Sequence, residues 1–344
     1  MLTHLQDLGI RLGDFTLPAL SKRETDNALA ILGAFYGNLD SSADGAFDPA
    51  LLVPRGDEAA IRAALERDAP QLAASARALR KTLEGDYSAV LVRRMQLDHL
   101  PPAQRSFILF GLSLCMGTPT PTDQILRRIV WDVKASAARM QAGDVSTFSE
   151  HAYEAGLHTD TQYFDHPERY VLLYFVRGAD CGGGISRLRD VTCIRRQLAR
   201  SERGRWALEF LSQQRLPFRI PATFTGTGRR DVVELTYATV FSDTPAIRFR
   251  VDTLEAGLAA RPEYATPQVR EALAILYAEL ERPEFVYEEL LGADSVLLIN
   301  NHEVLHGRTE FADMQRHAVR IRIADTLAPL AVRQREELEA ACAA

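Results

Sequence analysis

The feature that most constrains the fold is a change of hydrophobic patterning about a third of the way along the chain. Before it, apolar residues recur at helical spacing in Ser21–Leu39 and in the Ala- and Leu-rich segment Asp57–Leu83. After it, short segments rich in β-branched and aromatic residues are separated by turn residues, which is typical of strands. This order favours a mixed α+β fold, in which a β-sandwich or jelly roll is flanked by helices.

Proline and glycine mark where the expected helices begin and end. Pro70 breaks or kinks the helix predicted over Asp57–Leu83, and Gly117 closes a short apolar helix over Ser106–Met116. In the strand-rich part a single inserted helix is expected over Pro267–Glu281, because proline is favoured in the first helical turn.

The last expected strand, His317–Asp325, alternates apolar residues with arginines, which indicates a strand with one buried face. Arg320 and Arg322 share the face opposite to the apolar residues. The other expected strands are Ser88–Arg93, Arg128–Val133, Tyr170–Val176, Val232–Val240, Ala246–Leu254 and Ser295–Asn300.

Composition excludes several classes of protein. The 344 residues carry a formal net charge of −6, so a strongly basic nucleic-acid-binding protein is disfavoured. No apolar run approaches the roughly 18–20 residues that span a bilayer, and the N-terminus does not resemble a signal peptide. The four cysteines lack the CxxC spacing of a thiolate zinc site and do not suggest a disulfide framework. We therefore expect a cytoplasmic protein without a nucleic-acid or membrane partner.

The first candidate site is the sequence Leu-His-Thr-Asp, which contains His158 and Asp160. Residues two apart in a strand point to the same face, so an imidazole and a carboxylate would lie side by side. Such a pair suits a divalent metal ion. Alone the motif is weak, because a His and an Asp on a solvated strand are common.

The second candidate site contains His302, Glu303 and His306, which spell HExxH, the zinc-peptidase motif. That motif requires a helix, because the two histidines must lie one turn apart. Here it follows the strand-like segment Ser295–Asn300, and Gly307 ends any helix at once. We interpret the match as coincidental and keep a zinc metallopeptidase as an alternative.

The two candidate sites fit together better than either fits alone. His158, Asp160 and His306 supply two imidazoles and one carboxylate. This set occupies one face of an octahedral metal and leaves three positions open, as in non-haem Fe(II) oxygenases.

At this point the chain resembles the Fe(II)/2-oxoglutarate-dependent dioxygenases of the taurine dioxygenase/clavaminate synthase group. The resemblance extends from about Arg93 to Leu327. It rests on the HxD motif and on a glycine-rich turn that ends in Ser186. It also rests on a strand that leads to His306-Gly307-Arg308 and on the RxxxR segment that begins at Arg316.

The resemblance implies a role for each matching residue. His158, Asp160 and His306 would be the iron ligands. Arg320 would bind the distal carboxylate of 2-oxoglutarate, because a guanidinium makes two parallel hydrogen bonds to a carboxylate. Ser186 would assist that contact, and Arg316 is a second candidate. Arg322 shares a face with Arg320 and either reaches the site or pairs with a carboxylate, and Asn301 is expected to form hydrogen bonds in the loop.

The implied reaction consumes O₂ and 2-oxoglutarate, releases succinate and CO₂, and hydroxylates an unactivated C–H bond. The expected substrate is a small polar metabolite, namely an amino acid that is free or bound to a carrier protein. Desaturation, cyclisation and a sulfonate-type substrate are alternatives within the family. A non-catalytic, cupin-like metal-binding protein is an alternative of another class. The sequence does not fix the oligomeric state.

The spread of the candidate ligands also predicts the domain organisation. They extend from His158 to Arg320, so this stretch must fold as a unit to bring them together. We expect a single domain over residues 1–344. It would comprise a helical layer over about 1–120 and a jelly-roll (double-stranded β-helix) core over about 88–327, with the inserted helix at about 267–281.

Overall fold

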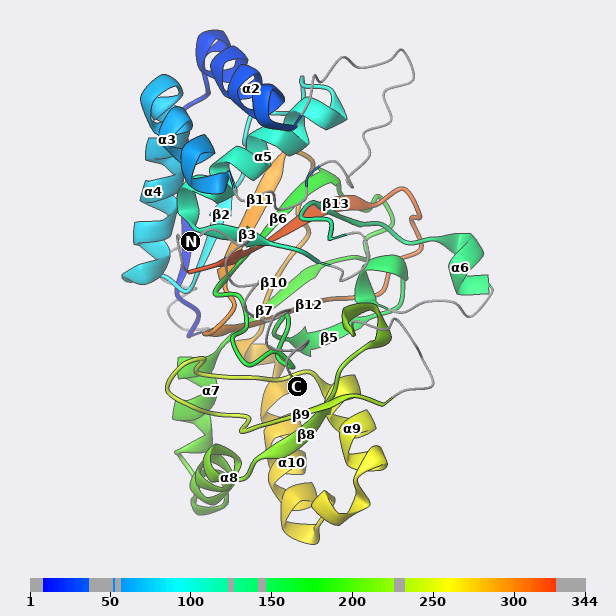
Figure 1. Ribbon diagram of the computed structural model, residues 1–344. Helices are drawn as coiled ribbons and strands as arrows, with labels where there is room; N and C mark the ends of the chain where they lie inside the picture. The colour runs from blue at the N-terminus through cyan, green and yellow to red at the C-terminus, as the bar shows by residue number, and fades with distance from the viewer. Residues whose placement is uncertain are drawn as a thin grey trace, which may run out of the picture.

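The computed structural model describes residues 9–36, 52, 57–122, 127–141, 147–225 and 233–325. In this part of the chain, helices and strands form three regions: a helical layer, a core of two sheets, and a second group of helices (Figure 1). The mixed fold with a jelly-roll core and flanking helices is the one that the sequence predicts.

The larger sheet runs through the centre of the molecule. Its central strands β11, β6 and β13 are antiparallel to one another, whereas β1 joins β2 in parallel. Strand β4 pairs with β13 beside β3. In spatial order the strands are β1 (Leu12–Phe15), β2 (Ala89–Val92), β11 (Ser295–Asn300), β6 (Tyr170–Arg177), β13 (His317–Ala324) and β3 (Thr118–Thr120), with β4 (Trp131–Val133) off this path.

The smaller sheet packs against one face of the larger sheet. Leu188 and Val304 from the smaller sheet share a buried apolar cluster with Phe175 and Leu297 from the larger one. The two sheets therefore enclose a core, as expected for a double-stranded β-helix. The smaller sheet has the order β10 (Tyr287–Glu289), β7 (Ser186–Asp190), β12 (Val304–Arg308) and β5 (Ala155–His158).

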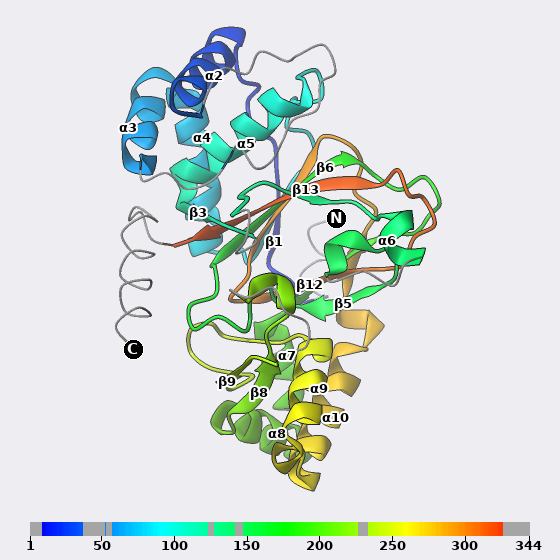
Figure 2. The same cartoon turned by 45° about the vertical axis from the view of Figure 1, so that its right-hand side comes forward.

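The N-terminal helices cover the other face of the larger sheet (Figures 1 and 2). Val319, Ile321 and Ile323 of β13 pack into this helical layer, whereas Ala318 belongs to the cluster between the sheets. The alternation in the sequence therefore separates the two faces of β13 correctly. The expectation of only one buried face is wrong, because the face that carries Ala318, Arg320 and Arg322 also points into the protein and Arg322 is 1% exposed. The helices of this layer are α2 (Lys22–Tyr36), α3 (Glu58–Asp68), α4 (Pro70–Glu84) and α5 (Pro102–Met116), with the break at Pro70.

The second group of helices corrects the expectation of a single inserted helix. Helices α7, α8, α9 and α10 pack around a two-stranded sheet and share one apolar cluster. Only α10 corresponds to an expected helix. The elements are α7 (Val191–Leu198), α8 (Glu202–Gln213), β8 (Leu216–Arg219), β9 (Leu235–Ala238), α9 (Val251–Ala260) and α10 (Pro267–Leu280). The short elements are α6 (Ala137–Gln141), η2 (Phe148–Glu150), η3 (Ala222–Phe224), η4 (Pro262–Tyr264) and η5 (Pro283–Phe285).

The strand expected over Ala246–Leu254 is wrong. Ile247 forms only an isolated bridge with Phe241, and helix α9 begins at Val251. The β-branched residues Val251 and Thr253 suggested a strand, but Leu254 and Leu258 are buried in the cluster beneath α9. Tertiary packing therefore overrides the local preference for a strand.

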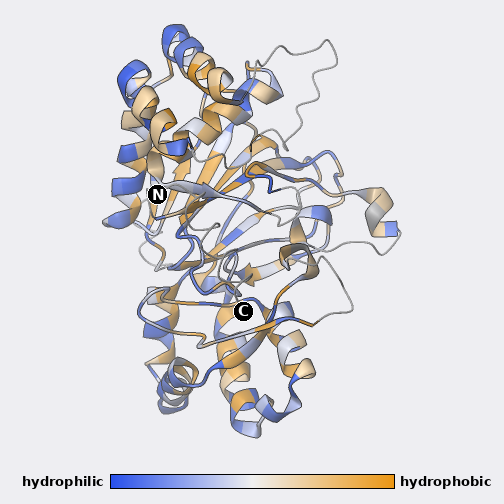
Figure 3. Ribbon diagram, in the orientation of Figure 1, coloured by the Kyte–Doolittle hydropathy of each residue, from blue (hydrophilic) through white to orange (hydrophobic). Residues whose placement is uncertain are grey.

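The distribution of hydropathy agrees with these layers. Figure 3 shows hydrophobic residues in the central strands and hydrophilic residues on the outward faces of the helices that cover them. Among the described residues, no helix combines the length and the apolar character needed to cross a membrane.

Leu298 tests the packing of the helical layer on the larger sheet. It is fully buried in β11, whereas Leu290 is 46% exposed. We expect Leu298→Ala to lower the free energy of unfolding by about 2–5 kcal/mol, because it leaves a cavity. Leu290→Ala is the matched control and should change it by less than about 0.5 kcal/mol. Urea denaturation measures both, and equal effects would contradict the assigned packing.

Candidate metal centre

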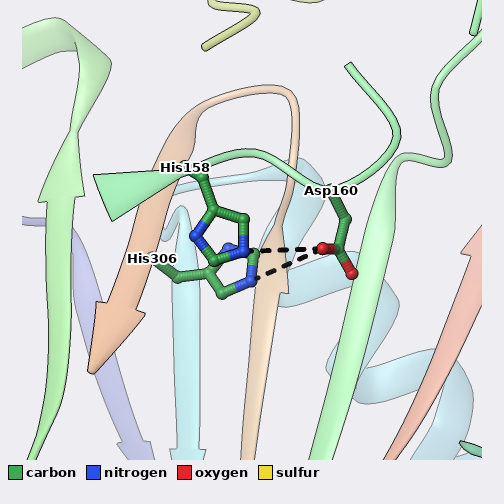
Figure 4. Close-up of side chains that lie close together, drawn as sticks. All are labelled: His158, Asp160 and His306. Atoms are coloured by element: carbon green, nitrogen blue, oxygen red, sulfur yellow. Dashed lines mark ion pairs between the residues drawn. The ribbon is translucent and has the colours of Figure 1, made fainter. Parts of the chain in front are cut away.

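Two neighbouring strands of the smaller sheet bring the two histidines together. His158 ends β5, His306 lies in β12, and the two residues are directly opposite each other in the antiparallel register. Their ring centroids are 4.3 Å apart. Figure 4 shows both imidazoles directed toward Asp160.

Asp160 completes the cluster from a turn rather than from the strand. Strand β5 ends at His158, so Asp160 does not share a strand face with His158. The expected reason for their proximity is therefore wrong. The turn nevertheless places Oδ1 of Asp160 3.6 Å from Nε2 of His158 and 4.0 Å from Nε2 of His306. The three buried side chains offer ligand atoms within 4.8 Å of one another, so they can hold one metal ion.

Backbone contacts fix the orientation of these groups. Nδ1 of His158 lies 2.8 Å from the carbonyl oxygen of Gly156, to which it donates in the tautomer that leaves Nε2 free as a ligand. The side chain of Asn301 accepts a hydrogen bond from the amide of Asp160 at 2.8 Å and donates to its carbonyl at 3.0 Å. Asn301 therefore holds the turn that presents the carboxylate.

Electrostatics favour the protonation states that bind metal. Burial opposes ionisation of Asp160, but the guanidinium of Arg320, 3.1 Å away, and the two imidazoles together hold the pKa of its carboxyl well below its usual range. Burial and the neighbouring His158 lower the pKa of His306 to about 3. At neutral pH the cluster thus offers a carboxylate and a neutral His306 imidazole, the forms that coordinate metal.

A pocket opens beside the cluster and extends between the two sheets. Apolar side chains line part of it, including Leu173, Phe175 and Leu297. Its polar lining consists of Ser149, His158, Ser186, His306, Arg308, Arg316 and Arg320. Five of these residues are predicted from the sequence, namely His158, Ser186, His306, Arg316 and Arg320. The fold gathers them at one pocket from different strands and a loop.

The arginines around this pocket differ in their partners. Arg320 pairs with Asp160. Arg316 is 4% exposed and lies over the rings of Phe175 and Phe311, and its guanidinium has no hydrogen-bonding or carboxylate partner within the described ranges. Burial lowers the pKa of Arg316 to about 10.

Arg322 lies on the same face of β13 as Arg320 but is not part of this pocket lining. It is almost fully buried and donates a hydrogen bond to the carbonyl of Pro121 at 2.9 Å. The nearby carboxylate of Glu168 helps to raise its pKa against the opposing effect of burial.

The HExxH residues do not form a zinc-peptidase site. His302 and Glu303 lie in a turn, and β12 begins directly after them. Nε2 of His302 lies 2.9 Å from the carbonyl oxygen of Pro167, and Glu303 pairs with Arg11. Neither of them joins the cluster of His306.

Sequence reasoning missed two residues that shape the site. The ring of Phe148 packs edge-on against His158, with centroids 5.0 Å apart. Arg308 donates hydrogen bonds to the carbonyls of Phe148, His151 and Tyr153, so it fastens this segment beside the cluster. The His-Gly-Arg sequence is a signal for Arg308, whereas no pattern marks Phe148.

A double-stranded β-helix with two histidines and one carboxylate facing a pocket defines the class of non-haem iron oxygenases. The family model described as "Taurine catabolism dioxygenase TauD, TfdA family" matches residues 53–322. The chain belongs to this family. No curated protein sequence matches it significantly.

Solved structures share the fold over nearly the whole chain. An asparagine oxygenase in complex with Fe(II), 2S,3S-3-hydroxyasparagine and succinate matches with a TM-score of 0.63 and 16% identity, covering 91% of this chain and 94% of that one. The non-heme iron oxygenase OrfP with Fe and alpha-ketoglutaric acid matches with a TM-score of 0.58 and 15% identity, at the same coverage. OrfP with Fe, succinate and (3S)-hydroxy-L-Arg matches with 16% identity and a TM-score of 0.58.

Asn301 provides a test of the geometry of the metal centre. We expect Asn301→Ala to weaken binding of Mn²⁺ about 10- to 100-fold, because the turn that carries Asp160 loses the two hydrogen bonds that fix its backbone. Asn27→Ala is the matched control, since Asn27 also donates to a backbone carbonyl but lies in the helical layer. Calorimetric titration measures both variants, and an unchanged affinity in Asn301→Ala would refute the positioning role.

Proposed function

We propose that this chain is an Fe(II)- and 2-oxoglutarate-dependent oxygenase that hydroxylates a C–H bond of an amino acid. The observation that carries the proposal is the convergence of His158, Asp160 and His306 at a pocket that is also lined by Arg316, whose guanidinium has no carboxylate partner among the described residues. Membership of the TauD/TfdA family supports the same reaction class.

The donor set fits Fe(II). Two imidazoles and one carboxylate form the facial triad of non-haem iron enzymes, and the described residues add no thiolate to it. When bound, Fe(II) with 2-oxoglutarate supplies the O₂ activation and oxidative decarboxylation that these side chains cannot perform. The residues of this chain hold the metal, orient both substrates and limit access of water.

The pocket also fits 2-oxoglutarate, a dicarboxylate. We propose that Arg316, with the hydroxyl of Ser186, binds its distal carboxylate. Arg316 is buried without an anionic partner among the residues that the structure describes, and an isolated buried charge is unfavourable until an anion binds. Arg320, the first choice from the sequence, already neutralises Asp160 and becomes the second candidate.

An amino acid is the proposed substrate class. Two of the similar structures contain hydroxylated amino acids, 3-hydroxyasparagine in one and (3S)-hydroxy-L-Arg in the other. At 16% sequence identity these structures support a shared fold, but they do not indicate which amino acid this chain would bind. We further propose that the helical layer and the jelly-roll core act as one catalytic domain, because Leu298 and Ile321 of the larger sheet contribute to the core of the helical layer.

Succinate release tests the reaction. With Fe(II), 2-oxoglutarate and a panel of L-amino acids, the wild type should release succinate in a substrate-dependent manner. His306→Ala and Asp160→Ala should lose more than about a hundredfold of this activity, beyond the usual effect of altering a residue behind the ligands.

Glu303→Gln is the control, because Glu303 lies outside the metal cluster and pairs with Arg11. It should retain succinate release. Metal binding without O₂ consumption for any substrate would instead support a non-catalytic protein. Peptidase activity abolished by Glu303→Gln would support the zinc alternative.

The assignment of the two arginines is tested by a pair of matched variants. We expect Arg316→Gln to raise the KM for 2-oxoglutarate about 10- to 100-fold, the effect of losing a charged hydrogen bond to a carboxylate. Arg320→Gln should raise this KM less and weaken metal binding more, because Arg320 stabilises the ionised Asp160. Steady-state kinetics with both variants measures the difference, and the reverse order would restore Arg320 as the carboxylate-binding residue.

A further inference from the structure

A third arginine lies beside the metal centre but has no role in the site described above. Arg250 directly precedes helix α9. The residue before it, Phe249, forms hydrogen bonds with Thr159, which lies between the metal ligands His158 and Asp160. The amide of Thr159 donates to the carbonyl of Phe249 at 2.8 Å, and the amide of Phe249 donates to the hydroxyl of Thr159 at 3.1 Å. These reciprocal bonds fix the start of α9 next to His158 and Asp160.

Arg250 contacts the wall of the pocket described above rather than lining that pocket itself. Its guanidinium lies 4.0 Å above the ring of Phe148, and that ring packs against His158. Its Nε and Nη2 atoms donate to the two carboxylate oxygens of Asp252, each at 2.7 Å. Among the described residues, hydrogen bonds are found for Nε and Nη2 but not for Nη1. Arg250 is 8% exposed, so it is oriented and nearly desolvated but keeps one donor free.

The charges around the metal centre are unbalanced. The described residues bury only two carboxylates in this region, Asp160 and Glu168, and Asp252 is partly exposed. The buried guanidinium groups are those of Arg250, Arg308, Arg316 and Arg322, and the side chain of Arg320 is 11% exposed. A divalent metal adds further positive charge, so 2-oxoglutarate leaves cationic groups without anions. The surroundings favour a second anionic ligand and disfavour a cationic one.

We infer that Arg250 binds the free α-carboxylate of the substrate. This inference rests on the proposed function and narrows it in two ways. The substrate would be a free amino acid rather than a thioester on a carrier protein, because a thioester has no free α-carboxylate. Its net charge would be zero or negative, because an arginine or lysine side chain would add a cation to an already cationic site.

Asp252 and Phe148 serve this role by positioning the guanidinium. The carboxylate of Asp252 fixes the plane of the fork from one side, and the ring of Phe148 supports one face. Nη2 of Arg308 donates a hydrogen bond to the carbonyl oxygen of Phe148 at 2.8 Å, which holds Phe148 in place. If Arg250 were only a structural cap for α9, the same contacts would exist, but its substitution would not change substrate affinity selectively.

Binding measured without turnover distinguishes the two roles. The protein loaded with Mn²⁺ and 2-oxoglutarate is titrated by calorimetry with L-asparagine, L-aspartate, L-glutamate and L-arginine, and with the α-carboxamides of the same amino acids. We expect the wild type to bind at least one neutral or acidic free amino acid and to bind its carboxamide more weakly. Arg250→Gln should weaken binding of the free amino acid about 10- to 100-fold and leave the affinity for 2-oxoglutarate unchanged.

Two further variants control for effects on folding. Arg250→Lys keeps the charge but not the planar fork and should bind with intermediate affinity. Arg261→Gln removes an exposed arginine beyond the far end of α9, and it should bind all ligands as the wild type does. Thermal unfolding of each variant verifies that the fold persists.

The outcomes separate this inference from the proposed function. Equal amino-acid affinity in Arg250→Gln and Arg261→Gln, tight binding of the carboxamides, preference for L-arginine, or no binding of any free amino acid would overturn the inference. Normal binding without succinate release in the wild type would instead overturn the proposed function alone.

Discussion

The pairing of β5 with β12 is the interaction on which the candidate site depends. Its register sets His158 directly opposite His306, and residues in such positions have side chains close enough to share a ligand. The turn after β5 then returns Asp160 to the same point, where Asn301 holds its backbone. A shift of one residue in the register would direct one imidazole to the other face of the sheet.

Much of the fold follows from residue patterns, but the second group of helices does not. The alternation in β13 predicts its extent and the shared face of Arg320 and Arg322, but not that this face is buried, and Pro70 predicts the boundary between α3 and α4. The capping residues Asp190 and Ser201 are local signals for α7 and α8 that the expected elements did not include, whereas α9 carries a contrary signal. Val251 and Thr253 favour a strand, and only burial of Leu254 against the neighbouring elements stabilises the helix.

The ligand set is predictable from chemistry, whereas the roles of the arginines are not. A sequence shows that Arg316 and Arg320 lie close in the chain, but not which guanidinium already has a carboxylate partner. That depends on the turn that brings Asp160 to Arg320 and leaves Arg316 between two aromatic rings. Arg250 has no sequence signal, because only the hydrogen bonds of Phe249 with Thr159 place it beside the metal ligands.

The position of Arg316 over Phe175 and Phe311 has a consequence for stability. A buried cation without an anion costs free energy, and folding must supply that cost before any ligand arrives. In return the guanidinium is already desolvated and oriented, so an incoming anion gains the interaction with little loss of side-chain entropy. Folding and ligand binding are therefore thermodynamically linked: the ligand-free protein is the less stable form, and an anion that binds Arg316 stabilises the folded protein.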